Sequence, residues 1–438
     1  MSVHLLARQT KQGSFVIDRI AVNSLDYSGH ETSPSLCLVR ICPQNGAMHT
    51  VLVLGTTNAR NQFQRFGISQ SDRLMHTYVI GKTGVGKTTL LENLILQDLA
   101  QGNGCAILDP HGDMVERIHG WNKDQQATDK SRIVYFNAPD PTLPFGYNPL
   151  RHVNVSLRPL LASGVLEVFK KLWDEAWGVR MEHIFRNVLL TLLDQPHSTL
   201  ADIPRILTDK QYRTQAVQHV TSQYVRDFWK KEFAKYSYRY RADAIAPILN
   251  KVGGFLANPI LSRILTEPPV NLSLRQIMDN KQVLLVNLAK GKLGEDASHL
   301  LGGLLLTSLG LAAFSRADQE PENRVPFHTY VDEFQNFTTL SLVNMASELR
   351  KYGMSLTLAN QYLSQLDPDI RSAILGNVGT LISFRVGAED TRILAQQFEP
   401  VFDQYDLLNL PNHEYYIRLM IDGSPSRPFS ATALPPSI

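Results

Sequence analysis

The sequence YVIGKTGVGKTTLL occupies residues 78–91, and the rest of the chain is organised around it. An apolar run leads into a glycine-rich turn and Lys-Thr, after which Leu91, Leu94, Ile95 and Leu99 follow at helical spacing. This order of strand, loop and helix carries the G-x-x-x-x-G-K-[ST] pattern of a phosphate-binding loop (P-loop). A chance glycine-rich turn is the alternative, and the flanking strand and helix argue against it. The sequence therefore predicts binding of a nucleoside triphosphate.

The residue types in this loop suit phosphate chemistry. Glycines let the backbone curl so that its N–H groups point at phosphate oxygens, and the following helix aims the positive end of its dipole at the same anion. We expect Lys87 to reach the β- and γ-phosphates of ATP and the Thr88 hydroxyl to ligate Mg²⁺. The predicted nucleotide-binding residues are Gly81, Lys82, Thr83, Gly84, Val85, Gly86, Lys87, Thr88 and Thr89.

The composition describes a folded protein of two or three domains. The chain has 438 residues, of which 43% are hydrophobic and 19% charged, and this excludes a disordered chain. A net charge of +2 restricts any nucleic-acid surface to a local patch. The three cysteines are too few for a disulfide framework, and the first residues lack the apolar core of a signal peptide, so we expect a cytoplasmic protein. Residues 300–314 are shorter than the ~20 residues of a membrane span, so we expect a buried helix there and no transmembrane segment.

The pattern along the chain predicts an α/β fold with an insertion. Short strands at 14–20, 35–41 and 48–54 indicate a small N-terminal β element. Beyond it, strands alternate with helices, which predicts a mostly parallel sheet covered on both faces. Residues 151–280 show helical periodicity with almost no strand candidates and indicate an inserted all-helical domain. The expected boundaries are 1–70 for the β element, 71–150 and 281–425 for the two halves of the core, 151–280 for the insertion and 426–438 for a C-terminal tail.

A second motif, Tyr330-Val331-Asp332-Glu333, ends an apolar strand with two acids, as a Walker B motif does. An aspartate at the strand end can hold Mg²⁺, and the following glutamate can deprotonate or orient the attacking water. Apolar strands often end in acids, so the pattern alone is weak evidence. The P-loop about 245 residues earlier makes the Walker B interpretation strong. We expect Asp332 to be a metal residue together with Thr88, and Glu333 to be catalytic.

Gln361 and Arg350 complete the predicted catalytic set. Gln361 ends the next strand, and we expect that strand to lie between the P-loop and Walker B strands, where a glutamine can sense the γ-phosphate. Arg350 ends the preceding helix. It either complements the helix dipole or acts as an arginine finger toward nucleotide in a neighbouring subunit. Lys351 competes for the finger role, and the bidentate geometry of arginine favours Arg350.

Two further stretches have a structural and a functional interpretation. Asp109 follows a strand and could lie near Mg²⁺, but Asp113 and Glu116 read as an N-cap and capping-box pair that explains part of this segment without catalysis. Residues 226–241 interleave basic and aromatic residues. They could stack bases and track phosphates, although a solvated helix face with core aromatics gives the same pattern and is slightly favoured.

Taken together, these motifs resemble the HerA/FtsK superfamily of DNA-pumping ATPases, and the soluble domains of TraG/TraD-like type IV coupling proteins in particular. The P-loop alone is unspecific. The resemblance depends more on Asp332 to Phe337 (DEFQNF), on Glu348 to Gly353 (ELRKYG) and on a glutamine eleven residues after Arg350. The similarity to this superfamily extends from about residue 70 to residue 425.

The resemblance implies a RecA-like core in a hexameric ring, with ATP and Mg²⁺ at subunit interfaces and DNA in the central channel. It also implies that Gln361 is the sensor and that Arg350 is supplied in trans. Membrane-anchored coupling proteins begin with transmembrane helices that this sequence lacks, so a partner would have to supply the anchor.

We therefore expect an ATP-driven DNA translocase that works with a nuclease, relaxase or membrane-anchor partner. The alternative is a nucleotide-gated assembly or regulatory ATPase that acts on protein partners in secretion or defence without pumping DNA. Stimulation of the ATPase by DNA would separate the two.

Overall fold

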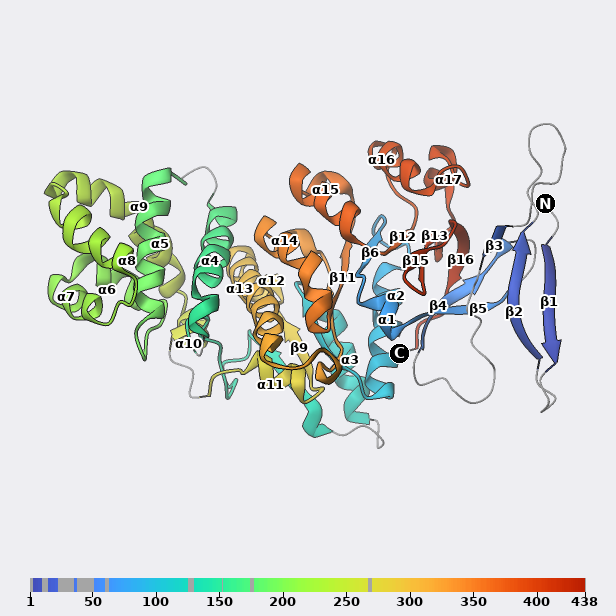
Figure 1. The fold of residues 1–438 in the computed structure, drawn as a ribbon, viewed down its shortest axis with the longest axis horizontal. Helices are drawn as coiled ribbons and strands as arrows, with labels where there is room; N and C mark the ends of the chain where they lie inside the picture. The colour runs from blue at the N-terminus through green and yellow to red at the C-terminus, as the bar shows by residue number, and fades with distance from the viewer. Residues whose placement is uncertain are drawn as a thin grey trace.

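The computed structural model describes residues 3–9, 15–22, 35–37, 51–59, 63–124, 130–151, 153–173, 177–266 and 270–437. The strands expected at 14–20, 35–41 and 48–54 lie partly outside these residues. The described chain is elongated, with a helical bundle at one end, an α/β core in the middle and a small β-sheet at the other end (Figure 1).

The core is built on one large sheet whose central strands are parallel. Across the described residues the sheet has eleven strands in the order β5-β4-β16-β13-β12-β6-β11-β10-β7-β9-β8. Seven adjacent strands form the parallel part: β12 (Thr380–Ser383), β6 (Thr77–Ile80), β11 (Met354–Asn360), β10 (Phe327–Val331), β7 (Gly104–Asp109), β9 (Val283–Asn287) and β8 (Ile133–Asn137). The predicted mostly parallel α/β sheet is confirmed, and β11 lies between the P-loop strand β6 and the Walker B strand β10, as predicted.

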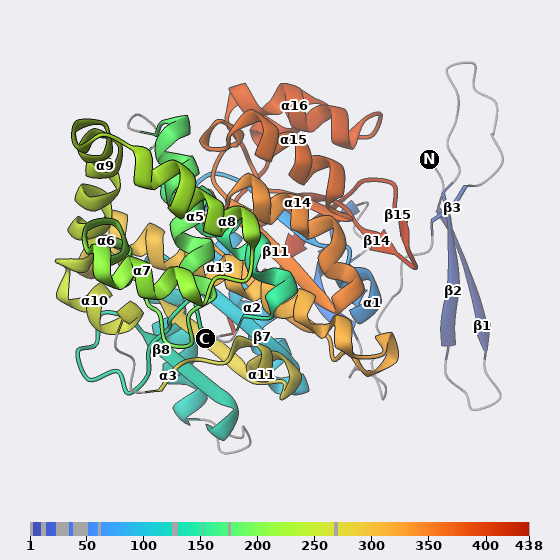
Figure 2. The same ribbon diagram turned by 60° about the vertical axis from the view of Figure 1, so that its left-hand side comes forward.

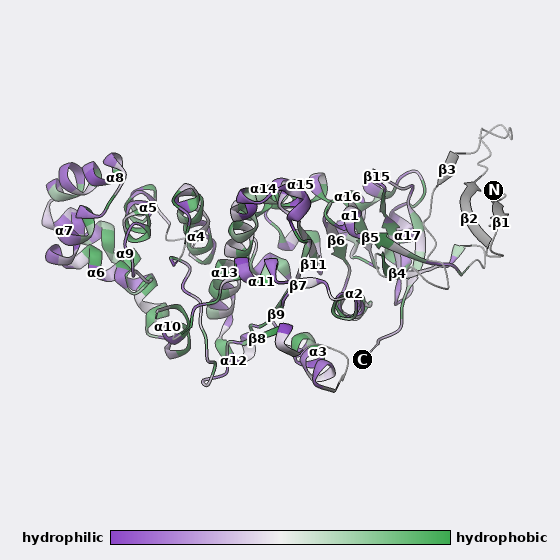
Figure 3. Ribbon diagram, turned by 60° about the horizontal axis from the view of Figure 1, so that its bottom comes forward, coloured by the Kyte–Doolittle hydropathy of each residue, from purple (hydrophilic) through white to green (hydrophobic). Residues whose placement is uncertain are grey.

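Successive side chains along these strands point to opposite faces of the sheet, and each face packs into its own hydrophobic core. Tyr78 and Ile80 belong to one buried cluster, whereas Val79 between them belongs to the other. Parallel strands that are buried on both faces read as continuous apolar runs, and these runs made them visible in the sequence. Helices α2 (Lys87–Gln101) and α3 (Asp113–Asp124) cover one face, and α14 (Leu340–Leu349) and α15 (Pro368–Asn377) cover the other (Figure 3).

An antiparallel extension enlarges the sheet beyond β12. It consists of β13 (Glu414–Arg418), β16 (Phe429–Ala433), β4 (Val51–Thr57) and β5 (Arg65–Ser69). The expected boundaries at residues 70 and 425 therefore do not coincide with the limits of the sheet, because strands on either side of both boundaries pair within it. The pairing of β16 with β4 joins residues more than 370 positions apart, and nothing in the local pattern of short edge strands indicates it. Strands β1 (Val3–Gln9), β2 (Phe15–Val22) and β3 (Ser35–Cys37) form a separate sheet.

The insertion between β8 and β9 is helical. Its helices α5, α6 and α9 pack on one another, and α4 packs on the core helix α13 (Glu295–Ser315). Figure 2 shows this bundle beside the core, on the side away from the N-terminal sheet. The insertion contains α4 (Arg158–Leu172), α5 (Val179–Leu193), α6 (Asp202–Thr208), α7 (Lys210–Gln218), α8 (Gln223–Asp227), a π-helical turn (Phe228–Glu232), α9 (Tyr238–Leu256), α10 (Pro259–Thr266) and α11 (Leu274–Asp279).

Helix α13 is the apolar stretch that the sequence placed in the core. Among single helices of the described residues, it is the one long and apolar enough to cross a membrane by length and composition. In the structure 78% of its most apolar window is buried. It packs against α4, α11 and α14.

The remaining helices are short or cover the edges of the core. They are α1 (Gln70–Arg73), α12 (Lys290–Leu293), α16 (Ala388–Phe398) and α17 (Gln404–Asn409). Helix α1 immediately precedes the P-loop strand β6, and its last residue, Arg73, is buried.

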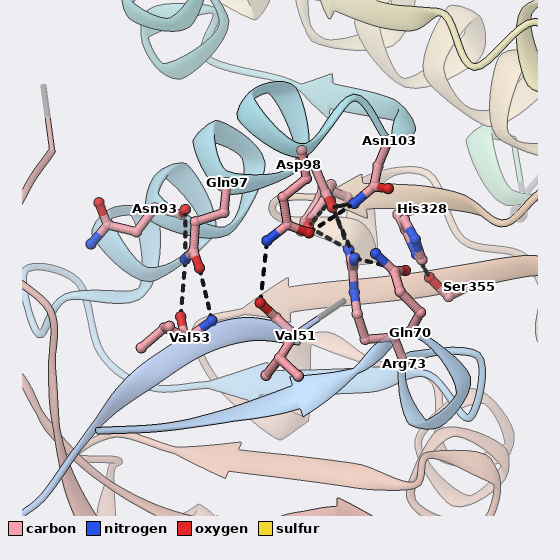
Figure 4. A network of polar contacts seen from close by, with 12 residues as sticks. Val51, Val53, Gln70, Arg73, Asn93, Gln97, Asp98, Asn103, His328 and Ser355 are labelled. Carbon is pink, nitrogen blue, oxygen red and sulfur yellow. Dashed lines mark hydrogen bonds and ion pairs between the residues drawn. The ribbon is translucent and has the colours of Figure 1, made fainter. Parts of the chain in front are cut away.

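A buried polar network fixes the P-loop helix to its neighbours. Both terminal nitrogens of Arg73 donate to the Asp98 carboxylate at 2.8 and 2.7 Å. The Tyr330 hydroxyl also donates to Asp98 at 2.6 Å, and Asn103 Nδ2 donates at 2.8 Å. Figure 4 shows Arg73, Asp98 and Asn103 close together between α2 and the strands below it. Because Arg73 precedes β6, Asp98 lies on α2 and Tyr330 lies on β10, this ion pair joins the elements that carry both nucleotide motifs.

Candidate active site

The P-loop connects β6 to α2 at the carboxyl edge of the sheet. Gly84 and Gly86 have φ of 77° and 114°, conformations that glycine adopts without strain. A Cβ added to Gly84 would meet nothing within 4 Å, so the loop leaves open space at this point. The loop backbone is tied to its surroundings, because Lys82 N donates to Arg385 O and His413 N donates to Val85 O, both at 2.9 Å. The contacts of Arg385 and His413 had no signal in the sequence.

Lys87 lies under the loop and is almost fully buried. Its ammonium donates to the carbonyl oxygens of Gly81 at 2.5 Å and of Lys82 at 2.9 Å. Burial lowers its pKa, although the charges of Asp332 and Glu333 act in the opposite direction. Thr88 and Thr89, two of the predicted nucleotide-binding residues, lie half-buried in the first turn of α2. Lys87 is thus a desolvated cation between the loop and the Walker B acids.

Asp332 and Glu333 follow β10, which is separated from the P-loop strand β6 by β11. Asp332 is 7% exposed, and burial, followed by the nearby carboxylates of Glu333 and Asp109, raises its pKa to about 7. The Asp332 carboxylate accepts a hydrogen bond from Glu333 N at 3.0 Å. Glu333 has a φ of 47°, a left-handed conformation that is rare for a residue with a side chain. Such strained backbone is concentrated at functional sites.

Gln361 joins the P-loop to the Walker B glutamate. Its amide nitrogen donates to Glu333 Oε1 at 2.8 Å, and its amide oxygen accepts from the Thr83 hydroxyl at 3.0 Å. The structure therefore brings three predicted residues from three segments into one hydrogen-bonded chain. One amide group contacts both the phosphate loop and the carboxylate, the position that a sensor of bound phosphate needs.

Gln335 also contacts Glu333, and the sequence reasoning missed it. Its Nε2 donates to Glu333 Oε2 at 2.5 Å, so both carboxylate oxygens of Glu333 accept from side-chain amides. The only signal was its place two residues after Glu333 in the DEFQNF stretch. The 3₁₀ turn Phe334–Asn336 directs its side chain back toward the carboxylate.

Asp109 has the capping role that the sequence assigned to Asp113. Its carboxylate accepts from the backbone N–H groups of His111, Met114 and Val115 at 2.9 to 3.1 Å. Asp113 is instead the first residue of α3, so its expected role as N-cap is wrong. The physical reason is that Gly112, with φ of 88°, turns the chain so that the first N–H groups of α3 face the end of β7 and the Asp109 carboxylate. Asp109 still lies close enough to contribute to the raised pKa of Asp332.

Arg350 lies at the opposite edge of the sheet from the P-loop. It begins the 3₁₀ turn that ends at Gly353, whose φ of 73° fits the predicted helix end. The seven residues of β11 separate this turn from Gln361, which corresponds to about 23 Å. The exposed Arg350 guanidinium contacts Met75 Sδ at 2.7 Å. Lys351, the alternative finger, is paired with Glu348 at 2.6 Å.

The basic and aromatic stretch of the insertion divides into core and surface. Phe228, Trp229 and Phe233 are buried, as the core interpretation requires. Tyr224 and Tyr238, by contrast, are 69% and 89% exposed. The cationic side chains exposed around them are Lys230, Lys231, Lys235 and Arg239.

The residues at the carboxyl edge fit a magnesium nucleotide. The open space at Gly84 and the N-terminus of α2 suit a phosphate group. Within the described residues no group of three or more His, Cys, Asp or Glu side chains could hold a metal by itself. Mg²⁺ in such a site takes few protein ligands and shares the nucleotide phosphates. The raised pKa of Asp332 reflects buried carboxylates that a cation would stabilise.

Comparison with family models identifies the chain. Residues 67–307, more than half of the 438 residues, match the model of the central domain of helicase HerA. This chain belongs to the HerA family. A second model, described as the TraM recognition site of TraD and TraG, matches residues 326–396, which include Asp332, Arg350 and Gln361. The resemblance to HerA/FtsK ATPases of the TraG type is thereby confirmed. Among curated proteins, none matches this HerA-family chain.

Solved structures share the fold over most of both chains. The plasmid coupling protein TrwB, in complex with the non-hydrolysable ATP analogue ADPNP, aligns with a TM-score of 0.62 at 16% identity, covering 89% of this chain and 90% of TrwB. TrwB in complex with ADP and Mg²⁺ aligns with a TM-score of 0.59 at 16% identity, covering 87% and 88%. VirB4 of Thermoanaerobacter pseudethanolicus aligns with a TM-score of 0.60 at 14% identity, covering 88% and 96%. The RecA-like P-loop ATPase fold is therefore established for this HerA-family chain.

Proposed function

We propose that this chain is an ATP-driven DNA translocase that hydrolyses ATP at the interfaces of a homo-hexameric ring. The observation that carries ATP hydrolysis is the chain of contacts from Thr83 through Gln361 to Glu333. A site that only binds nucleotide needs the P-loop, but it does not need a glutamate held beside it. ATP and Mg²⁺ are the proposed ligands, in agreement with the compounds named in the TrwB complexes.

Each residue has a defined role in this proposal. Bound Mg²⁺ would neutralise phosphate charge during transfer to water. Thr88 and Asp332 would hold the metal, and the residues from Gly81 to Thr89 would hold the phosphates. Glu333 would take a proton from the attacking water, and Gln361 would report whether the γ-phosphate is present.

The position of Arg350 supports the proposal of a ring-shaped assembly. Because it lies at the far edge of the sheet, it cannot reach nucleotide in its own subunit, whereas a neighbouring subunit could present its nucleotide to it. An arginine finger in trans is worth roughly 10³–10⁵ in rate. We propose Arg350 in this role and a hexamer as the assembly.

DNA is the proposed substrate for two reasons. The family model that matches this chain describes a helicase domain, and the structural neighbours include a conjugative coupling protein. The insertion exposes Tyr224 and Tyr238 among lysines and an arginine, a combination that suits stacking on bases and contact with phosphates. We place the protein in the cytoplasm, working with a relaxase, a nuclease or a membrane-anchor partner.

Displacement of a third strand tests translocation directly. A triplex-forming oligonucleotide on duplex DNA should be released when wild-type protein and ATP are present, and retained with Glu333→Gln. Stable DNA binding without ATP-dependent displacement would contradict the translocase. ATP hydrolysis that ignores DNA altogether would favour the alternative, an assembly ATPase acting on protein partners.

A further inference from the structure

The helical insertion contacts the Walker B loop through the last two turns of α4. Lys171 Nζ donates to the carbonyl oxygens of Gln335 and Thr338, the latter at 2.7 Å. One turn earlier, Glu167 Oε2 accepts from Ser341 N at 2.6 Å. Residues four apart share a helix face, so one face of α4 holds both ends of the segment 335–341.

This segment carries the glutamine that holds the Walker B glutamate. Gln335 receives the Lys171 ammonium on its backbone carbonyl and donates its side-chain amide to Glu333 Oε2. Two hydrogen bonds, one to the backbone and one from the side chain of Gln335, therefore connect helix α4 of the insertion to Glu333. Side-chain amides of Gln335 and Gln361 hold the two carboxylate oxygens of Glu333, so the direction of this carboxylate depends on these partners.

The environment of Lys171 differs from that of a surface lysine. The residue as a whole is exposed, but its ammonium donates to two backbone carbonyls, and desolvation lowers the pKa of Lys171 to about 8. The opposing attraction comes from Asp367, the N-cap of α15, which follows the Gln361 segment. The ammonium thus contacts the loop after Glu333 and is attracted by a carboxylate that follows Gln361 in the chain.

We propose that Lys171 is a positioning residue for ATP hydrolysis, which fixes the backbone of residues 335–338 and thereby the direction of Glu333 through Gln335. The inference rests on the proposed catalytic role of Glu333. It also gives the insertion a regulatory role, because a ligand that shifts α4 relative to the sheet changes the hold of Gln335 on the glutamate.

Steady-state ATPase kinetics of the full chain test this inference. Lys171→Met should lower kcat at least about tenfold and leave KM for ATP within about twofold, because misplacement of a catalytic group affects the transition state more than binding. Lys171→Arg should recover most of kcat, since a guanidinium can donate to both carbonyls. Lys170→Met is the matched control, as it removes the same charge from an exposed neighbour on the same helix.

A double-mutant comparison separates positioning from general damage. Gln335→Ala should lower kcat to a similar extent, and Lys171→Met with Gln335→Ala should fall little further, because both act through one contact. Should Lys171→Met fail to fold, Lys171→Gln replaces it, because it removes the charge but keeps a polar side chain, and the same comparison with Gln335→Ala is made.

These experiments distinguish a failure of the Lys171 inference from a failure of the proposed function. An active wild type with equal kcat in Lys171→Met and Lys170→Met overturns the inference and leaves the proposed function intact. Multiplicative effects in the double variant also overturn it. A wild type without ATPase activity overturns the proposed function itself, and the inference with it.

Discussion

A buried aspartate lies toward each edge of the parallel sheet, and the surroundings shift the pKa values of the two in opposite directions. Toward the amino edge, burial alone would raise the pKa of Asp98, but the charge of Arg73 reverses this and lowers it. At the carboxyl edge, burial and neighbouring carboxylates raise the pKa of Asp332 to about 7. The charge of the first aspartate is neutralised within the chain, whereas the second lies beside two other acids and Lys87 offsets their charge only in part, so a bound cation would stabilise it. The difference indicates which edge holds the fold together and which edge binds a ligand.

The largest expected effect is the loss of the cation at the carboxyl edge. Lys87→Ala removes the ammonium between the P-loop and the Walker B acids, and we expect ATP hydrolysis to become undetectable. ATP binding, measured by calorimetry, should weaken at least about hundredfold, the size of a lost contact to a charged phosphate group. An unchanged melting temperature of the variant would show that the fold is intact. Unaltered hydrolysis would contradict the P-loop assignment.

Arg350 tests whether the amino edge serves a neighbouring subunit. Arg350→Ala should lower kcat by about 10³ or more without weakening ATP binding, while Lys351→Ala should change it little because Lys351 already pairs with Glu348. Mixing Arg350→Ala with Glu333→Gln subunits should restore some activity, since certain interfaces regain both intact groups. Mixtures that exchange subunits and stay inactive would count against a finger in trans.

The buried ion pair predicts a change in stability. Asp98→Ala leaves Arg73 charged and without its bidentate partner, and we expect a loss of about 3–5 kcal/mol in the free energy of unfolding. Urea denaturation measures it. Replacing both residues, as Arg73→Met with Asp98→Ala, should restore part of the loss. A single variant as stable as wild type would show that the network contributes little.

His76 gives a smaller effect that depends on pH. Its Nε2 donates to Ala346 O at 2.7 Å and its Nδ1 accepts from Leu356 N at 3.0 Å, so the ring is buried and neutral. Burial lowers its pKa from 6.5 to about 4. The folded pKa is therefore below the unfolded one, and the stabilisation is fully present above pH 6.5 and is lost as pH falls toward 4.

The expected loss from this one group is about 2 kcal/mol between pH 7 and pH 5. Urea denaturation at several pH values measures it, with His76→Asn as the control, because asparagine tolerates the positive φ of 64° and does not titrate. Equal pH dependence in both proteins would contradict a neutral buried His76.

The sequence was sufficient for the features that depend on local motifs. The P-loop, the Walker B strand and the position of β11 between their strands could be predicted, since apolar runs and strand ends carry a strong local signal. The pairing of β16 with β4 could not, because it joins the two ends of the chain. The contacts of Gln335 and Lys171 were also invisible, since they depend on a turn after Glu333 and on the packing of α4.

The capping of α3 shows a different limit. Asp109 lies four residues before Asp113, which begins α3, and the motif rule favours Asp113 as the cap. The left-handed turn at Gly112 brings the first N–H groups of α3 to Asp109. Which aspartate caps the helix therefore depends on a backbone angle rather than on a residue type.

We propose that the carboxyl edge of the sheet hydrolyses ATP in response to DNA. The most direct measurement is the steady-state ATPase rate with and without single- and double-stranded DNA, repeated with Glu333→Gln. We predict a rate that DNA stimulates and a loss of about 10²–10⁴ in the variant, the usual contribution of a general base, with ATP binding retained. A rate that DNA does not change, or that survives in Glu333→Gln, would contradict the account.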